Sequence, residues 1–201
     1  TADAAPGDLV LVQSERGRPL GWALWSASSQ IAIRMVSTQK NVDDATLWRD
    51  RIAAAIAYRD TLGLDATACR LVHGEADGLP ALVVDRYADV LVVQTLCQGM
   101  DRRKAAIVDA LVALVKPRGI LARNDPKVRR LEALDETVEV LHGEVPDTVR
   151  AREGRIWHDV DVRQGQKTGL FLDQCENHLA AARYARGAAL DAFTYHGGFA
   201  D

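Results

Sequence analysis

The stretch that decides how this chain folds is Gly165-Gln166-Lys167-Thr168-Gly169-Leu170-Phe171-Leu172-Asp173-Gln174-Cys175-Glu176-Asn177. A polar loop between two glycines is followed by a short apolar run and then by a helical pattern. Asp173 stands at the start of that pattern, where a carboxylate can act as an N-cap. Because amides, an ammonium and a carboxylate lie so close together in sequence, we expect them to point into one place.

A second unusual stretch follows near the end of the sequence, Asp191-Ala192-Phe193-Thr194-Tyr195-His196-Gly197-Gly198-Phe199. The apolar run over residues 188–193 predicts a buried strand that delivers a glycine turn to a sheet edge. Glycines at such an edge let the backbone approach a nucleotide ligand. Gly197-Gly198 alone matches neither the dinucleotide nor the P-loop fingerprint, and a tight structural turn is the commoner reason for two adjacent glycines.

The composition is that of an ordinary globular chain. Of its 201 residues, 48% are hydrophobic and 26% are charged, and the formal net charge is −3. No apolar run is long enough for a membrane span and no signal peptide opens the sequence, so we expect a cytoplasmic protein with no membrane partner. The three cysteines form no CxxC pair and the five histidines no cluster with ligand spacing, which predicts neither a disulfide framework nor a metal site.

The N-terminal part of the chain carries three short strand patterns and one helix pattern. The strands are expected over Leu9–Gln13, Gly21–Trp25 and Ile31–Val36. Three such strands are too few to bury a core of their own, so this sheet either leans on the next unit or, as we favour, has lost its N-terminal strands. Asp43-Asp44 is an N-cap signal for a helix over Ala45–Leu62, which Gly63 ends.

The middle of the chain predicts a compact α/β unit with the order β-β-β-α-β-α-β. Its strands are expected over Cys69–Gly74, Ala81–Tyr87, Asp89–Gln94, Gly119–Arg123 and Thr137–Leu141. Asp101 is expected to cap the first helix of the unit, and Asp125-Pro126 to open a second, short helix through Leu131. A hairpin of Thr148–Arg152 and Ile156–Val162 then leads into the polar loop.

Charge is unevenly distributed along this middle unit. From Asp101 to Arg130 there are nine Lys or Arg against three Asp, whereas Leu131 to Asp147 carries six acids and no Lys or Arg. A basic face on one element could attract phosphates, in which case charge reversal at Arg129 and Arg130 should weaken RNA binding. An ordinary solvated helix face explains the same pattern equally well.

Three motifs together resemble one family, and they cover essentially the whole chain. They are Leu71–Pro80 with Val83–Tyr87, then Gly165–Asn177, and finally Asp191–Phe199. In this order they resemble the ribosomal RNA methyltransferases dependent on S-adenosyl-L-methionine (SAM), which join a PUA domain, a central α/β domain and a C-terminal Rossmann-like domain. The likeness is greatest to the large-subunit group that methylates C5 of a cytosine.

The resemblance implies SAM as the methyl donor, ribosomal RNA as the partner, and two sets of cofactor-binding residues. The first set borders the SAM pocket and consists of Thr168, Gly169, Phe171, Asp173 and Gln174. The second matches the family's first SAM-binding motif and consists of Asp191, Phe193, Tyr195, Gly197 and Gly198. Chemically, Asp173 or Asp191 could accept hydrogen bonds from the SAM ammonium, and Phe171 or Phe193 could pack on the adenine. Lys167 could equally form only a local salt bridge.

The fold expected from the resemblance is α+β and multidomain. Residues 1–40 would be a partial PUA-like β-barrel, 41–64 a connecting helix and 65–150 the central α/β domain. Residues 151–201 would hold the hairpin and the start of a Rossmann-like class I methyltransferase domain. Whether the protein is a homodimer is left open.

The sequence departs from the family pattern in two ways. Cys175 stands where the family usually has Arg. In addition, a cytosine-C5 methyltransferase needs a thiolate that attacks C6 of the base, and no cysteine here matches the family nucleophile. We therefore assign no catalytic residue and expect this chain to be inactive by itself. Two alternatives stay open: methylation of a purine nitrogen in rRNA, which needs no such thiolate, and a non-catalytic RNA-binding fragment.

Overall fold

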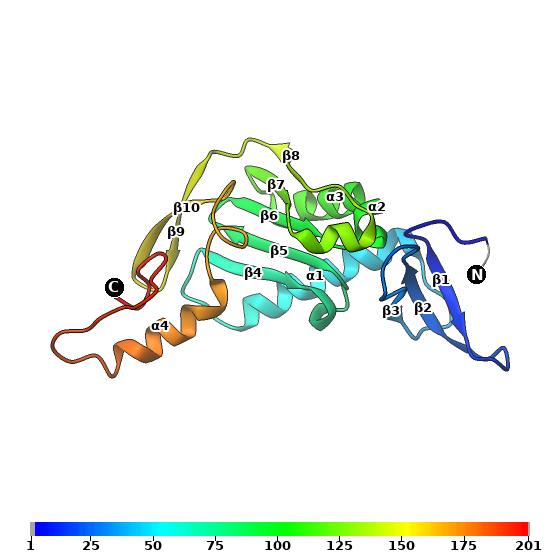
Figure 1. The fold of residues 1–201 in the computed structure, drawn as a ribbon, viewed down its shortest axis with the longest axis horizontal. Coiled ribbons are helices and arrows are strands. Elements are labelled where there is room, and N and C mark those ends of the chain that lie inside the picture. The colour runs from blue at the N-terminus through cyan, green and yellow to red at the C-terminus, as the bar shows by residue number, and fades with distance from the viewer. Residues whose placement is uncertain (1–2, 201) are drawn as a thin grey trace.

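The computed structural model describes residues 3–200, which form three sheets arranged along an elongated molecule (Figure 1). The N-terminal sheet lies at one end, the five-stranded sheet in the middle, and the C-terminal hairpin at the other end. The mixed α/β architecture with several sheets agrees with the expected multidomain class.

The N-terminal sheet has the antiparallel order β1-β2-β3, formed by β1 (Leu9–Gln13), β2 (Pro19–Trp25) and β3 (Ile33–Ser37). The three predicted strands are thus confirmed. Leu24 is buried against Gly99 of the middle unit, at a point where any side chain on residue 99 would overlap it. The hydroxyl of Ser26 donates to Glu132 Oε2 over 2.7 Å. These two contacts attach the sheet to the next unit.

The helix α1 (Asp44–Thr61) follows, close to its predicted bounds. The Asp43 carboxylate accepts a hydrogen bond from the backbone N–H of Ala45, 3.0 Å away, and caps the helix. Gly63 has a φ of +59° directly after the helix end, as a glycine in the C′ position should. The side chains of Trp48 and Ile52 are buried and attach α1 to the central sheet.

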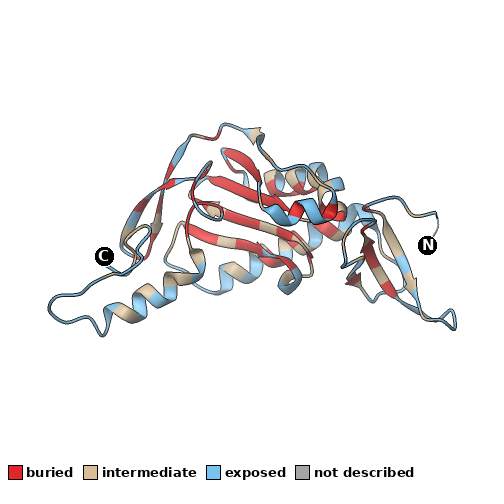
Figure 2. Cartoon of the chain, viewed as in Figure 1, coloured by how far each residue is buried: buried red, intermediate tan, exposed pale blue. Residues whose placement is uncertain are grey.

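The central sheet has the order β4-β5-β6-β7-β8, and Figure 2 shows its inner strands coloured mostly as buried. The strands are β4 (Ala68–His73), β5 (Leu82–Tyr87), β6 (Val90–Thr95), β7 (Gly119–Asn124) and β8 (Thr137–Gly143). All neighbours are antiparallel except β6 and β7, which are parallel and joined by α2 (Gln98–Arg102) and α3 (Lys104–Val115). The helices α1 and α3 cover one face of the sheet, where Val84, Leu91 and Ile120 enter the main core.

One expectation for this unit was wrong. Asp101 caps no helix but lies inside α2, where its carboxylate accepts hydrogen bonds from Thr95 Oγ1 at 2.8 Å and Arg129 Nη1 at 2.9 Å. The short helix expected after Asp125-Pro126 is present and is a 3₁₀ helix, η2 (Lys127–Glu132). Internal hydrogen-bond partners outcompete the capping role of Asp101. Another 3₁₀ turn, η1 (Gly74–Asp77), connects β4 to β5.

The face of the central sheet opposite the helices is partly covered by the hairpin of β9 (Thr148–Glu153) and β10 (Ile156–Asp161). Val149, Ala151 and Val160 from the hairpin pack with Tyr87 and Val92 of the sheet in a second apolar cluster. The hairpin confirms the prediction, and it brings the polar loop that follows it onto the same face.

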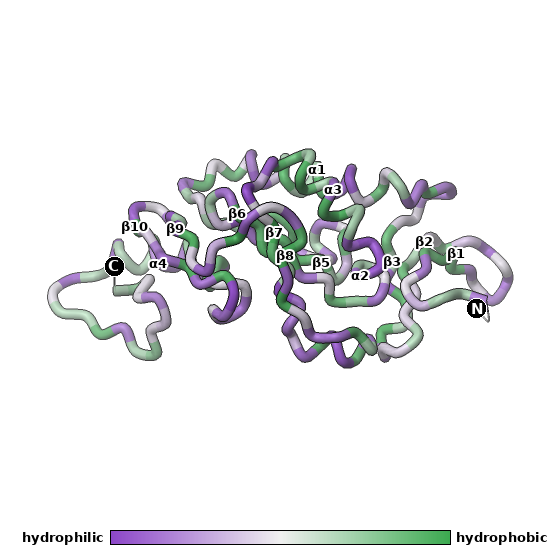
Figure 3. Tube along the Cα trace, turned by 90° about the horizontal axis from the view of Figure 1, so that it is seen from above, coloured by the Kyte–Doolittle hydropathy of each residue, from purple (hydrophilic) through white to green (hydrophobic). Residues whose placement is uncertain are grey.

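The C-terminal part differs most from expectation. After η3 (Leu172–Gln174) comes α4 (Cys175–Ala182), and Gln174 instead of Asp173 precedes it as the N-cap residue. The predicted strand over 188–193 is not formed. Leu190 is 91% exposed, and Phe193 has a φ of +62° with its side chain fully exposed. Among residues 3–200 no neighbouring strand pairs with this run, and a strand needs partners for its backbone groups. Figure 3 shows the segment as a loop beyond the layered core.

Candidate functional site

Thr168 anchors the polar loop to the central sheet. Its side chain is fully buried, and its hydroxyl donates to Asp85 Oδ2 over 2.6 Å. Its oxygen lies 2.9 Å from the Tyr87 hydroxyl, which also accepts the backbone N–H of Leu170 at 3.1 Å. Burial, and after it the nearby Asp85 carboxylate, raises the pKa of Tyr87 to about 12, so this phenol stays neutral. The loop is therefore held at both Thr168 and Leu170.

Two glycines allow the loop to lie close to its supports. Gly169 has a φ of +144°, and a side chain there would overlap Val160 of the hairpin. A side chain on Gly165 would overlap the carbonyl oxygen of Asp161. The buried guanidinium of Arg123 donates to the carbonyls of Gly165, at 3.1 Å, and Val162, at 2.9 Å. The loop is thus tied to β7 as well as to β5.

The structure brings the two unusual stretches together, as expected. The Tyr195 hydroxyl accepts a hydrogen bond from the backbone N–H of Gln166 over 2.8 Å. The Nε2 atom of His196 lies 3.1 Å from the carbonyl oxygen of Gly169. The rings of Phe171 and Tyr195 meet edge to face, with centroids 5.7 Å apart. Residues separated by about thirty positions in sequence therefore share one site.

A cavity of about 230 Å³ lies where these stretches meet. It is lined by Glu153, His158, Leu170, Phe171, Gln174, His178, Asp191, Ala192, Phe193, Thr194, Tyr195, His196, Gly198 and Phe199. The Oδ2 atom of Asp191 is buried in this wall and accepts no hydrogen bond from residues 3–200. Gly198 lies so close to the His178 ring that any side chain there would overlap it.

Six of the ten predicted cofactor-binding residues line this cavity, and four do not. The lining six are Phe171, Gln174, Asp191, Phe193, Tyr195 and Gly198. Thr168 and Gly169 lie behind the wall as supports, and the backbone N–H of Gly197 donates to Thr194 Oγ1 over 3.1 Å. Asp173 points away to Lys167, whose ammonium lies 2.8 Å from its carboxylate and lowers its pKa. The local salt bridge considered for Lys167 is therefore the one that forms.

Sequence reasoning missed a buried carboxylate at the cavity, Glu153. Its side chain is 5% exposed, and its Oε2 atom lies 3.0 Å from His178 Nδ1 and 3.8 Å from His158 Nε2. The signal was present in the alternation of β9, which places Glu153 on the same inward side as Val149 and Ala151. The turn signal of Glu153-Gly154 obscured it.

The cysteines near and far from the cavity are not activated as thiolates. Burial, followed by the charge of Glu153, raises the pKa of Cys175 to about 11. Burial likewise raises the pKa of Cys69 and Cys97. A nucleophilic cysteine needs the opposite shift, so none of these three pKa shifts is of the kind that activates a thiol.

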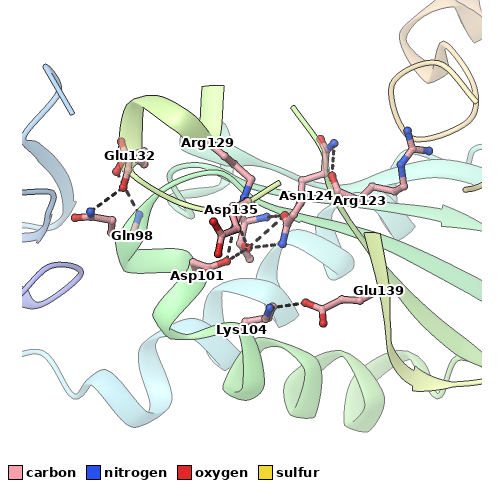
Figure 4. Close-up of polar contacts among 11 residues, drawn as sticks. Gln98, Asp101, Lys104, Arg123, Asn124, Arg129, Glu132, Asp135 and Glu139 are labelled. Atoms are coloured by element: carbon pink, nitrogen blue, oxygen red, sulfur yellow. Dashed lines mark hydrogen bonds and ion pairs between the residues drawn. The ribbon is translucent and has the colours of Figure 1, made fainter. Parts of the chain in front are cut away.

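The hypothesis that Arg129 contacts phosphates is wrong. Its side chain is 3% exposed, and it donates to Asp101, to the carbonyl of Asp135 at 2.7 Å and to the carbonyl of Thr95 (Figure 4). Arg103 is similarly buried and paired with Asp44. Much of the positive charge in this segment therefore holds the fold together and is not a basic face.

Comparison with known proteins places the chain beside ribosomal RNA methyltransferases. Residues 1–38 match a family model described as a PUA-like domain. The chain is 41% identical over 199 residues to "Ribosomal RNA large subunit methyltransferase I" of Pseudoalteromonas atlantica, and 40% identical over 200 residues to the protein of that name from Shewanella frigidimarina. Each match covers 96% of this chain and 50% of the relative. The chain thus spans about half the length of these curated relatives.

Two solved structures share the fold at low sequence identity. One is a proposed SAM-dependent methyltransferase from Streptococcus mutans, with a TM-score of 0.73 and 20% identity over 88% of this chain and 46% of the other. The second is a proposed methyltransferase in complex with SAH (S-adenosyl-L-homocysteine), with a TM-score of 0.74, 20% identity, and coverage of 88% and 45%. Within residues 3–200, no helix has the length and apolarity to cross a membrane, and no His, Cys, Asp and Glu side chains group as metal ligands.

Proposed function

We propose that this chain is part of a SAM-dependent methyltransferase that modifies large-subunit ribosomal RNA, with C5 of a cytosine as the acceptor atom. The observation that carries the proposal is the meeting of the loop 165–171 with the turn 194–198 around one cavity. The names of the curated relatives support ribosomal RNA as the substrate. The SAH in a structural neighbour supports SAM as the methyl donor.

The side chains at the cavity suit the two ends of SAM. The buried Asp191 Oδ2 atom lacks a hydrogen-bond donor among residues 3–200, and a ligand ammonium would supply one. Phe171 and Tyr195 offer aromatic edges and faces to an adenine. The absence of a side chain at Gly198 makes room for the His178 ring, which also lines the cavity. When bound, SAM would supply an electrophilic methyl group, and these residues would hold and orient it.

The cavity forms only one wall of such a site. Its volume of about 230 Å³ is below the ~300–1,000 Å³ that is typical of ligand sites. Phe193 is fully exposed beside it, which leaves an aromatic side chain available to a further element. Because no cysteine of this chain is activated, we place the nucleophile in the half of the relatives that this chain does not span.

The domain division stays a proposal with the bounds 1–40, 41–64, 65–150 and 151–201. The last boundary falls within β9. We assign RNA binding in part to residues 1–40, because they lie within or beside the PUA-like match. Methylation of a purine nitrogen, which needs no cysteine nucleophile, is the alternative chemistry. A non-catalytic RNA-binding fragment is the alternative role of the chain alone.

Calorimetry with SAH tests the cofactor assignment. The 201-residue chain should bind SAH weakly or not at all, whereas the longest reading frame that contains it should bind in the micromolar range. In that longer protein, Asp191→Asn should weaken SAH binding about tenfold through loss of a charge-assisted hydrogen bond, and the exposed Asp159→Asn serves as the control. Micromolar binding by the 201-residue chain would refute the single-wall interpretation, and no binding by the longer protein would refute the SAM assignment.

The acceptor atom is tested separately. The longer protein would be incubated with SAM and unmodified large-subunit rRNA, and the nucleosides would be analysed by mass spectrometry. We expect 5-methylcytidine. A methylated purine instead would favour the alternative chemistry.

A further inference from the structure

A second hollow lies on the helix-free face of the central sheet, on the other side of the loop 165–171 from the cavity. It has a volume of about 540 Å³ and is lined by Arg70, Val83, Gln94, Leu96, Arg123, Asp125, Pro126, Gln164, Gly165, Gln166 and Lys167. We call it the sheet groove. None of the predicted cofactor residues lines it. Its volume lies within the range in which proteins bind small ligands, of about 300–1,000 Å³.

The pairing of the strands explains why these side chains gather. Arg70 lies opposite Asp85, Val83 opposite Gln94, and the parallel register of β6 and β7 sets Gln94 beside Arg123. Because alternate residues of a strand share one face, this row lies opposite the helices. The hairpin covers only the neighbouring end of the face. The groove is the uncovered remainder.

The chemistry of the groove suits a base and a phosphate together. Val83, Leu96 and Pro126 supply apolar contacts. Each of the three cations is paired with a carboxylate: Arg70 with Asp85, Arg123 with Asp125 and Lys167 with Asp173. The side chains of Gln164 and Gln166 are exposed and form no hydrogen bond with any of residues 3–200, so their amides are available to a ligand. Amides can both donate to and accept from the edge of a base. The groove thus combines apolar contacts, ion-paired cations and two exposed amides.

Arg70 is prepared to offer its flat face to a base. Its Nε and Nη2 atoms donate to both oxygens of the buried Asp85 carboxylate, at 2.7 and 2.9 Å, and Nη1 lies 3.3 Å from His73 Nδ1. The edges of the guanidinium are therefore occupied, while 31% of the side chain is exposed. A guanidinium held flat in this way is a common stacking partner for unpaired RNA bases. Duplex RNA does not expose its bases for such stacking.

The loop 165–171 links the groove to the cavity. The side chains of Gln166 and Lys167 line the groove, while the Gln166 backbone N–H is bonded to the Tyr195 hydroxyl in the cavity wall. Phe171, near the end of the same loop, lines the cavity. A strand of RNA that lay in the groove would therefore continue directly towards the proposed methyl donor.

We propose that the sheet groove binds an unpaired nucleotide of single-stranded RNA, one that flanks the nucleotide to be methylated. The base stacks on Arg70 and is contacted by Gln164 and Gln166, and the exposed Lys167 exchanges its partner Asp173 for a phosphate. The flanking position rests on the proposed function, whereas binding of single-stranded RNA in the groove does not.

Fluorescence anisotropy on the 201-residue chain tests this without SAM. The probe is a labelled single-stranded RNA of roughly ten nucleotides and mixed sequence, a length within the range of known single-strand sites. Arg70→Lys should bind about tenfold more weakly, because a stacked base contributes a factor of this size. The double variant Gln164→Ala with Gln166→Ala should also bind about tenfold more weakly, because it removes the amides that contact the same base. Arg70→Lys keeps the positive charge beside Asp85 and so preserves the fold.

Lys104→Ala is the matched control for Lys167→Ala. Lys104 is likewise a partly exposed lysine, whose ammonium lies 2.7 Å from a carboxylate, but it sits on α3 away from the groove. Lys167→Ala should weaken binding and lower the slope of log affinity against log salt by about 0.7, whereas Lys104→Ala should change neither. Equal affinity in all variants, or displacement of the probe by duplex RNA as readily as by a single strand, would overturn the proposal.

Cross-linking of the unmodified chain avoids any effect of substitution on folding. A 4-thiouridine in the same RNA should cross-link to Arg70, Gln94 or residues 164–167, and cross-links confined to residues 3–40 would contradict the groove. The two proposals fail separately. If the longer protein does not bind SAH but the groove cross-links form, the cofactor assignment alone is refuted. If the longer protein binds SAH but the groove cross-links do not form, the groove alone is refuted.

Discussion

The strand β7 and the segment 188–193 have similar sequence patterns and different structures. Both are six-residue runs with an apolar first half, and a glycine stands at or directly before the start of each. Every residue of β7 is buried, and the strand pairs with β6 on one edge and β8 on the other. In the segment 188–193, Leu190 and Phe193 are almost wholly exposed. An apolar run therefore becomes a strand only where neighbouring strands satisfy its backbone groups and cover its side chains.

The largest effect is expected at a buried charge of the central unit, Arg129 of η2, which lies against the end of β6. Arg129→Ala would leave Asp101 and the carbonyls of Thr95 and Asp135 without their shared donor. Breaking a buried pair from one side costs about 3–5 kcal/mol. Urea denaturation should detect this loss. The neighbouring Arg130→Ala, whose side chain is 68% exposed, is the control and should cost at most about 1 kcal/mol.

The second prediction compares two leucines directly. Leu121→Ala in β7 should lower the free energy of unfolding by about 2–5 kcal/mol, because it leaves a cavity in a fully buried cluster. Leu190→Ala should change it by at most about 0.5 kcal/mol in the same denaturation experiment, since the side chain is exposed. A large effect of Leu190→Ala would mean that the segment 188–193 is packed in solution.

The third prediction concerns the point where the two regions join. Thr168→Val would remove the hydroxyl that donates to Asp85 and contacts Tyr87, at a cost of about 1–3 kcal/mol. Thr194→Val removes a hydroxyl of the C-terminal turn that accepts only the N–H of Gly197, and it should cost far less. Similar melting temperatures of the two variants would contradict the anchoring role of Thr168.

The smallest effect is expected at the exposed ion pair of the loop. The hydrogen bond from Lys167 lowers the pKa of Asp173 below its unfolded value of about 3.9. The stabilisation is therefore fully present above that unfolded value and is lost as pH falls through the folded pKa. At pH 7 Asp173→Asn should cost at most about 1 kcal/mol, because the carboxylate is 61% exposed. In a series of denaturation curves, this difference should vanish at low pH, and the control Asp159→Asn should show no such trend.

Much of the fold follows from local signals in the sequence. The cap at Asp43, the stop at Gly63 and the alternation of β9 and β10 each act within a few residues, so periodicity and capping chemistry were enough to predict them. The roles of Asp101 and Arg129 could not be predicted in this way. These two residues lie 28 positions apart in sequence. They become neighbours only when α2 and η2 pack at the end of β6.

The candidate site likewise has features that follow from local signals and features that arise only from packing. The sequence alone showed that the stretches 165–177 and 191–199 are unusual, because glycines and clustered polar residues carry their signal locally, and the family resemblance implied that they belong together. Only the tertiary structure decided which side chains line the cavity. Thr168, three residues from Gly165, instead donates to Asp85, which lies 83 residues away in sequence. The tertiary structure also revealed Glu153 and the sheet groove. Such sites arise from strand register and sheet pairing, which join residues that no short stretch of sequence contains together.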